Sequence, residues 1–251
     1  MTLPKPSGNT IAMGIVALLI SAFSWASSPL PQDASAIASG PEVALKLQEH
    51  QLKQSDDWWS IEIKYPHIER LEAFNTIIRQ HVTKVANDFR NGLPITAPKE
   101  YPNYVAYLKG DFKAQTLKNG IISVLFSYDE YTPGAAHPWG VLASIAYDTR
   151  QNRVLALADL FCPDSNYLSQ LSKIAIQELD KREYADKEEI RRGAAPSGHN
   201  FAVFTLTESE LVLHFQQYQV AAGAAGEPEP IAIPLTTLAP LLCERYRAAL
   251  K

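Results

Sequence analysis

The chain has 251 residues, of which 46% are hydrophobic, 20% charged and 10% aromatic. This length allows one large domain or two small ones, each with a buried core, and the composition argues against a disordered chain. A formal net charge of −4 leaves no basic surplus for holding a nucleic-acid backbone. Two cysteines are too few for a disulfide scaffold or for a zinc site built from four cysteines.

An uninterrupted run of apolar and small residues occupies positions 11–23, and Lys5 is the only charged side chain before it. The run is shorter than the roughly 20 residues that a membrane-spanning helix needs, and its length suits a secretory signal. Small residues at Ser24 and Ala26 then predict cleavage after Ala26. The sequence therefore predicts a signal peptide over residues 1–26 and a periplasmic or secreted protein without a stable membrane span. A retained membrane anchor is the alternative.

The segment 27–41 is rich in Ser, Pro and Ala and is typical of a flexible spacer before a folded part at 42–251. Cleavage after Ala26 would leave a net charge of −5, since it removes Lys5 and no acidic residue. In an oxidising compartment Cys162 and Cys243 can form a disulfide that closes a loop of about 80 residues. Two free buried thiols are the alternative.

The first part of the chain contains two predicted strands followed by one predicted helix. Strands are predicted at 43–52 and 58–64, and Pro66 fits the first turn of a helix. An apolar stripe with helical spacing follows and ends near Asn91 and Gly92. The stripe consists of Ile68, Leu71, Phe74, Ile78, Val82, Val85 and Phe89.

A run of strands comes next. Segments 105–117 and 121–132 flank Asn119 and Gly120, which are a strong hairpin signal. After a linker at 133–140, strands are predicted at 141–147 and 154–157. The pattern indicates an antiparallel meander with one face on a core.

The last part of the chain mixes short elements. A helix begins near residues 163–165, and the charged stretch 180–192 is typical of a solvated helix or loop. Further strands are expected at 201–206, 211–217 and 231–233, before a short helix at 236–242. Because strands and helices come in blocks, we expect an α+β fold with antiparallel sheets and helices packed on one side. Two closely joined lobes are expected, at about 42–100 and 101–251.

No nucleophile elbow, P-loop or zinc-protease motif is present, and six scattered histidines show no ligand spacing on one element. We therefore expect no metal, no cofactor and no enzymatic activity. Asp129 or Glu130 together with His137 could act as an acid–base pair of a glycan-modifying enzyme, which is the alternative. A turn histidine bonded to backbone is the simpler interpretation of His137.

Aromatic side chains at predicted strand ends and loops favour a protein-binding surface, because rigid rings commonly anchor protein partners. These are Tyr128, Tyr131, Trp139 and Tyr218, with His137 beside them in sequence.

Several segments resemble one known family of extracytoplasmic domains. Residues 132–140 (TPGAAHPWG) are similar to that family's Gly-Gly-Ala-His turn, and residues 154–161 are similar to its strand followed by Leu-x-Asp-Leu-Phe. The resemblance continues at 201–215 with Tyr218 and at 226–235, and covers about residues 57–243. The family is that of the RsiV-like domains, shared by the lysozyme-binding anti-sigma-V factor RsiV and by some exported polysaccharide deacetylases. Two departures are Ala135, where the family turn has a second glycine, and residues 222–224, where it has Ala-Pro-Tyr.

The resemblance implies an α+β fold and a protein-binding role in the bacterial cell envelope. It implies lysozyme or another muramidase as the class of partner. No nucleic-acid partner is expected, because the chain has no basic surplus. A negatively charged domain would favour encounter with a basic lysozyme.

Overall fold

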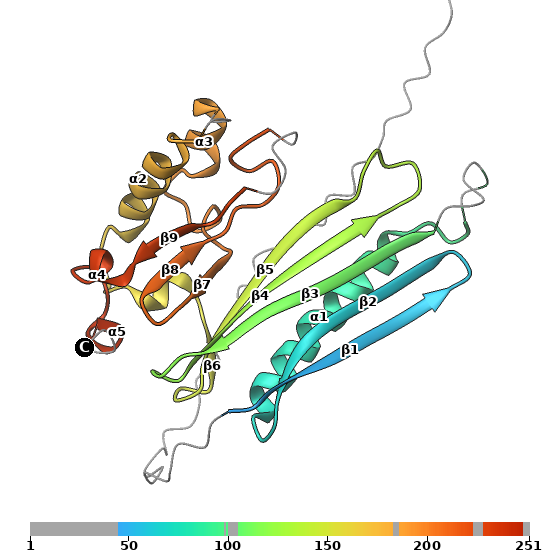
Figure 1. Ribbon diagram of the computed structural model, residues 1–251, viewed down its shortest axis with the longest axis horizontal. Helices are drawn as coiled ribbons and strands as arrows, with labels where there is room; N and C mark the ends of the chain where they lie inside the picture. The colour runs from blue at the N-terminus through green and yellow to red at the C-terminus, as the bar shows by residue number, and fades with distance from the viewer. Residues whose placement is uncertain (1–44, 98, 100–104, 183–185, 223–227, 248–251) are drawn as a thin grey trace, which may run out of the picture.

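The computed structural model describes residues 45–97, 99, 105–182, 186–222 and 228–247. It confirms the expected α+β class: a six-stranded sheet carries one long helix, and a separate three-stranded sheet carries shorter ones (Figure 1). The predicted signal peptide and spacer lie outside the described residues. Within the described part, no helix is both long and apolar enough to cross a membrane.

The large sheet has the strand order β1-β2-β3-β4-β5-β6. Its neighbours are antiparallel except for β2 and β3, which pair in parallel, so the sheet is mixed and not purely antiparallel. The parallel pair arises because the helix α1 (Glu72–Gly92) connects β2 to the neighbouring β3, and such a crossover returns the chain in the same direction. The strands are β1 (Leu47–Asp56), β2 (Trp59–Ile68), β3 (Ala106–Thr116), β4 (Ile121–Tyr131), β5 (Trp139–Asp148) and β6 (Arg153–Leu155).

Helix α1 packs on one face of this sheet through the apolar stripe seen in the sequence. Phe74, Ile78 and Val82 are at most 1% exposed and share a core with alternate residues of β2, β4 and β5. The helix begins later than predicted, because β2 continues through Pro66, which lies opposite Glu49 of β1. Pairing of β2 with β3 ends at Ile63, so the missing N–H of Pro66 removes no hydrogen bond to β3.

The second part of the chain builds its own core. It contains the 3₁₀ helix η1 (Leu157–Leu160), α2 (Tyr167–Leu179), α3 (Lys187–Gly193), β7 (Phe204–Leu206), β8 (Glu210–Leu213), β9 (Ile231–Pro234), α4 (Leu235–Leu238) and α5 (Glu244–Arg247). Strands β7, β8 and β9 form an antiparallel sheet. Its core includes Leu171, Phe201 and Phe215, each with 0% exposure.

The small sheet docks on the face of the large sheet that α1 leaves open. Val124 and Ile145 belong to the core with α1, whereas Ile121 and Ala146, which have the opposite parity, belong to the core with the small sheet. The large sheet is therefore covered on both faces where β4 and β5 pass between the two cores.

Side chains of the large sheet satisfy the free edge of β7. The hydroxyl of Ser144 accepts a hydrogen bond from the N–H of Phe204 (3.0 Å), and the hydroxyl of Ser123 accepts one from the N–H of Leu206 (2.9 Å). The amide of Gln115 donates to the carbonyl of Leu206. These contacts replace the neighbouring strand that an edge would otherwise need.

The predicted hairpin turn at Asn119 and Gly120 is confirmed, with Gly120 at φ +81°. The lobe boundary expected near residue 100 does not coincide with the break between the sheets. Strands on both sides of that point share the large sheet, and the break follows β6. The charged stretch 180–192 overlaps α3, and its described residues are largely solvent-exposed, except for the buried Ile190.

Candidate functional site

Three of the five predicted partner-binding residues come together at the junction of the two sheets. Trp139 opens β5, His137 lies in the turn before it, and Tyr218 follows β8. The rings of Trp139 and Tyr218 stack with centroids 5.1 Å apart and planes at 11°. Both rings are partly exposed, at 38% and 39%. We call His137, Trp139 and Tyr218 the aromatic platform.

The hydrogen bonds of His137 fix its tautomer when the ring is neutral. Nδ1 lies 2.8 Å from the carbonyl oxygen of Pro138, which can only accept, so Nδ1 carries the proton. Nε2, 3.3 Å from the Tyr218 hydroxyl, is then an acceptor, and Tyr218 donates to it. The phenolic oxygen keeps lone pairs that can accept a hydrogen bond from a ligand.

Tyr218 is held in a left-handed backbone conformation, at φ +65°. Such a conformation costs about 1 kcal/mol or more for a non-glycine residue, so surrounding contacts must maintain it. The side chain of Gln216 pairs with the N–H and the carbonyl of Leu142, at 2.9 and 2.7 Å. Gln217 accepts a hydrogen bond from the N–H of Gly140 at 3.2 Å. Both glutamines thereby cover the edge of β5 beside Trp139.

A third glutamine anchors the other side of the same loop. The amide of Gln219 donates to the carbonyls of Gly193 (2.8 Å) and Asn200 (2.9 Å), and its oxygen accepts from the N–H of Gln216. No pattern in the sequence predicted that these glutamines belong to the site. The run Gln-Gln-Tyr-Gln at 216–219 was the available signal, but only the fold shows which backbone groups it meets.

Tyr128 does not belong to this surface. It is 2% exposed, because the alternation of β4 turns it toward α1, where its hydroxyl lies 2.9 Å from Nε2 of His81. The expectation that Tyr128 is available to a partner is therefore corrected. Burial also raises its pKa.

Tyr131 is half-buried and lies on the opposite sheet face from Trp139. It stacks on Tyr107 with ring centroids 5.7 Å apart, and Nζ of Lys109 lies 5.1 Å from the centre of the Tyr107 ring. Trp139 pairs with Glu130, and neighbouring residues of a strand point to opposite faces. Tyr131 therefore stands apart from the platform.

The possible acid–base residues are not assembled as a catalytic group. Asp129 and Glu130 point to opposite faces of β4. Burial raises the pKa of Glu130, but the hydrogen bonds of His137 go to Pro138 and Tyr218, neither of which is a carboxylate. Among the residues that the structure describes, no group of three or more His, Cys, Asp or Glu side chains is arranged to hold a metal ion.

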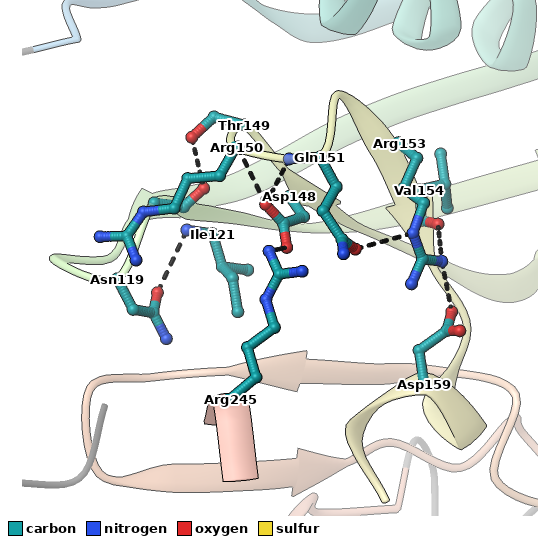
Figure 2. Close-up of polar contacts among 11 residues, drawn as sticks. Asn119, Ile121, Asp148, Thr149, Arg150, Gln151, Arg153, Val154, Asp159 and Arg245 are labelled. Carbon is teal, nitrogen blue, oxygen red and sulfur yellow. Dashed lines mark hydrogen bonds and ion pairs between the residues drawn. The ribbon is translucent and has the colours of Figure 1, made fainter. Parts of the chain in front are cut away.

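A second polar cluster ties the end of the chain to the large sheet (Figure 2). The buried carboxylate of Asp148 accepts hydrogen bonds from the N–H groups of Arg150 and Gln151, both at 2.9 Å, and pairs with the guanidinium of Arg245. A neighbouring ion pair joins Arg153 to Asp159 at 2.9 Å. Two backbone N–H groups and one guanidinium satisfy the buried Asp148 carboxylate and join α5 to the large sheet, so we assign this cluster a structural role.

The two cysteines lie beside an isolated bridge between Phe161 and Leu242. Both are free thiols in this structure. Burial and a hydrogen bond to the thiol of Cys162 raise the pKa of the Cys243 thiol. The expected disulfide stays a prediction.

Comparisons with known proteins give two family matches. Residues 52–139 match the family described as Deacetylase PdaC, and residues 158–235 match a protein family of unknown function, DUF3298. The chain is 30% identical over 186 residues to the peptidoglycan-N-acetylmuramic acid deacetylase PdaC of Bacillus subtilis (strain 168). This match covers 73% of the chain but 39% of that relative.

Two solved structures share the fold. A DUF3298 family protein of Pseudomonas aeruginosa PAO1 has a TM-score of 0.58 at 16% identity and covers 82% of this chain and 98% of its own. A DUF3298 family member from Bacteroides fragilis has a TM-score of 0.56 at 16% identity, covering 83% and 98%.

These matches support a relationship to the DUF3298 and PdaC families, which the expected resemblance to exported deacetylases anticipated in part. The similarity to RsiV itself stays a prediction. The platform draws on both matched segments, since His137 and Trp139 lie at the end of the first and Tyr218 lies within the second.

Proposed function

We propose that this chain is an exported, non-catalytic protein-binding module of the cell envelope, and that its partner docks on the aromatic platform. The observation that carries the proposal is the exposed stack of Trp139 on Tyr218, which two separate parts of the chain build together. Tryptophan and tyrosine are enriched among the residues that dominate binding at protein interfaces.

The platform has the features of a prearranged docking surface. The glutamines around Tyr218 hold it in place before any partner arrives, so little conformational entropy remains to be lost on binding. The Tyr218 oxygen offers an acceptor beside the apolar rings, which would fix the orientation of a donor group on the partner.

The setting of the proposal comes from the apolar N-terminal run and from the matched families. The curated relative is named for its action on peptidoglycan, which supports an extracytoplasmic, cell-wall location for this chain. Lysozyme and other muramidases, which meet the same polymer and are commonly basic, are the partner class we propose for a domain whose net charge would be −5 once residues 1–26 are removed.

Binding is tested by isothermal titration of the purified protein with lysozyme and a panel of muramidases. We expect Trp139→Ala and Tyr218→Ala to weaken binding at least about tenfold, because aromatic anchors at interfaces contribute about 2 kcal/mol or more. Tyr107→Ala is the matched control, since it removes a stacked tyrosine on the other sheet face. No binding at tens of micromolar would exclude this partner class, and equal affinities for all variants would exclude the platform.

The non-catalytic part of the proposal has its own test. Purified protein incubated with peptidoglycan should release no fragments and no acetate. Release that His137→Ala abolishes, while circular dichroism shows an intact fold, would overturn it in favour of the glycan-modifying alternative.

A further inference from the structure

Among the residues that the structure describes, strand β1 forms a long free edge of the large sheet, on the side away from the small sheet (Figure 1). All ten of its residues pair with β2 in one unbroken register, from Leu47 opposite Ile68 to Asp56 opposite Trp59. It contains no proline and no bulge, two devices that commonly prevent an edge from pairing with another strand. Its outer backbone groups are therefore a regular template for a further strand.

The hydrogen-bond pattern shows which residues of β1 face outward. The N–H of Ala106 on β3 donates to the carbonyl of Trp58 at 3.0 Å, so even-numbered residues of β2 direct their backbone groups to β3. Odd-numbered residues such as Trp59 then face β1, and Trp59 lies opposite Asp56. Even-numbered residues of β1 consequently face β2, and Glu49, Gln51 and Lys53 turn their backbone groups outward.

The charges of this strand, together with Lys46 directly before it, are arranged symmetrically about Gln51. Glu49 and Lys53 stand two positions to either side of it, and Lys46 and Asp56 stand five positions to either side. When a second copy pairs antiparallel about Gln51, Glu49 lies opposite Lys53 of the second copy, and Lys46 lies opposite Asp56. Outward-facing residues then meet outward-facing residues, as an antiparallel ladder requires.

Ion pairs within each copy extend this match. Nζ of Lys64 lies 3.5 Å from Oε1 of Glu49, and Nζ of Lys53 lies 2.8 Å from Oε1 of Glu62. These four side chains lie on the sheet face away from α1. Across the interface, Lys64 and Glu49 of one copy are then followed by Lys53 and Glu62 of the other copy, so that positive and negative charges alternate. Centring the pairing on Glu49 or Lys53 would place like charges opposite each other, and centring it on His50 or Leu52 would leave these charges unmatched.

We propose that the β1 edge associates with the β1 edge of a second copy of this chain, antiparallel and with its two-fold axis at Gln51. The two large sheets become one continuous sheet, with both copies of α1 on the same face. The contact is limited to one strand from each copy, so the dimer is weak and depends on concentration. The aromatic platforms lie toward the other edges of the two sheets and remain free, although the proposal does not depend on their function.

The association is measured by sedimentation equilibrium of the purified protein from about 1 to about 500 µM, a range that suits a small interface. We expect the mass to rise with concentration from that of one chain to that of two. Gln51→Pro removes an outward N–H and no backbone hydrogen bond to β2, and the side-chain hydrogen bond to Glu62 that it also removes is exposed, so it should abolish the rise while the melting temperature changes little. A protein that stays monomeric at the highest concentration, or a Gln51→Pro variant that still dimerises, would overturn the proposal.

A charge exchange tests the register. In the proposed register, Glu49→Lys places lysine opposite lysine, and Lys53→Glu places glutamate opposite glutamate. Each variant alone should therefore be monomeric. An equimolar mixture should recover dimers, because each lysine then meets a glutamate. Glu188→Lys, an exposed charge reversal on α3, is the control and should dimerise like the unchanged protein. A mixture that stays monomeric, or single variants that dimerise normally, would contradict the register and with it the proposal.

Discussion

At the scale of single residues, the platform depends on a close approach behind Tyr218. A Cβ atom added to Gly193 would lie 1.8 Å from the carbonyl oxygen of Gln219, far inside contact distance. The end of α3 and the Tyr218 loop can therefore meet only if this position has no side chain. Gly193 thus positions the loop although it contacts neither ring of the stack.

We predict that Gly193→Ala displaces the Tyr218 loop and lowers the free energy of unfolding by roughly 1–3 kcal/mol, the usual range for overpacking. Thermal unfolding measures the loss. Gly198→Ala is the matched control, because no atom lies within 4 Å of its added Cβ. Equal melting temperatures for the two variants would contradict the close contact.

At the scale of elements, α1 places a histidine against the large sheet. His81 packs on Phe126, with ring centroids 4.8 Å apart, and shares a hydrogen bond with the hydroxyl of Tyr128. Burial, together with the charge of Lys84, lowers the pKa of His81 to about 4 from its usual 6.5. The helix therefore packs with a neutral imidazole.

This shift predicts how stability depends on pH. As the pH falls from 6.5 toward 4, the unfolded chain protonates His81 and the folded chain does not, so the free energy of unfolding falls. The stabilisation is fully present above pH 6.5, and up to about 3 kcal/mol is lost by pH 4. Urea unfolding across this range measures the effect, and His81→Asn should flatten the curve. His214, whose pKa is also lowered to about 4, adds a loss of the same sign in both proteins. Identical pH profiles would contradict the assignment to His81.

A second prediction at this scale concerns the two cysteines, which lie near the two ends of the part of the chain that carries the small sheet. Cys162 precedes α2 and Cys243 precedes α5. The backbone N–H of each cysteine donates a hydrogen bond to the segment that carries the other one, at 2.8 Å for Cys162 and 3.0 Å for Cys243. We predict that an oxidising compartment joins them, which would stabilise the fold by at most roughly 4.5 kcal/mol for a loop of about 80 residues. Mass spectrometry of the exported protein measures the bond, and Cys162→Ser should remove the difference in melting temperature between oxidised and reduced samples. Two free thiols in protein taken directly from the envelope would contradict it.

At the scale of the whole molecule, hydroxyl groups join the two sheets. The buried Ser123 and the half-buried Ser144 accept hydrogen bonds from the edge of β7, so the small sheet has a fixed position on the large one. The same hydrogen bonds also fix the distance between Trp139, which opens β5 of the large sheet, and Tyr218, which follows β8 of the small sheet.

We predict that Ser123→Ala leaves the N–H of Leu206 buried without a partner and lowers the free energy of unfolding by about 1–3 kcal/mol. Chemical denaturation measures the change. Ser127→Ala, an exposed position on the same strand and the same face, should have no measurable effect. Because these hydrogen bonds fix the position of the small sheet and with it the platform, affinity for the partner should fall in Ser123→Ala and not in Ser127→Ala.

Much of the fold was readable from local patterns. The stripe of α1, the turn at Gly120 and the alternation of β4 each depend on neighbouring residues, and the structure contains all three. The sequence misplaced the start of α1, since Pro66 fits an early helical turn as well as the outer part of a strand. Only the length of pairing with β1 distinguishes the two.

The site divides in the same way. Composition and position identified Trp139 and Tyr218 as candidates, but they also suggested Tyr128, whose burial depends on which sheet face α1 covers. The symmetric charges around Gln51 are present in the printed sequence, yet their meaning depends on β1 being an edge. By itself the sequence determined the elements and the kinds of side chain they carry, because periodicity is a local property. The tertiary structure alone decided which of these side chains meet and which stay exposed, because both depend on contacts between residues far apart in the chain.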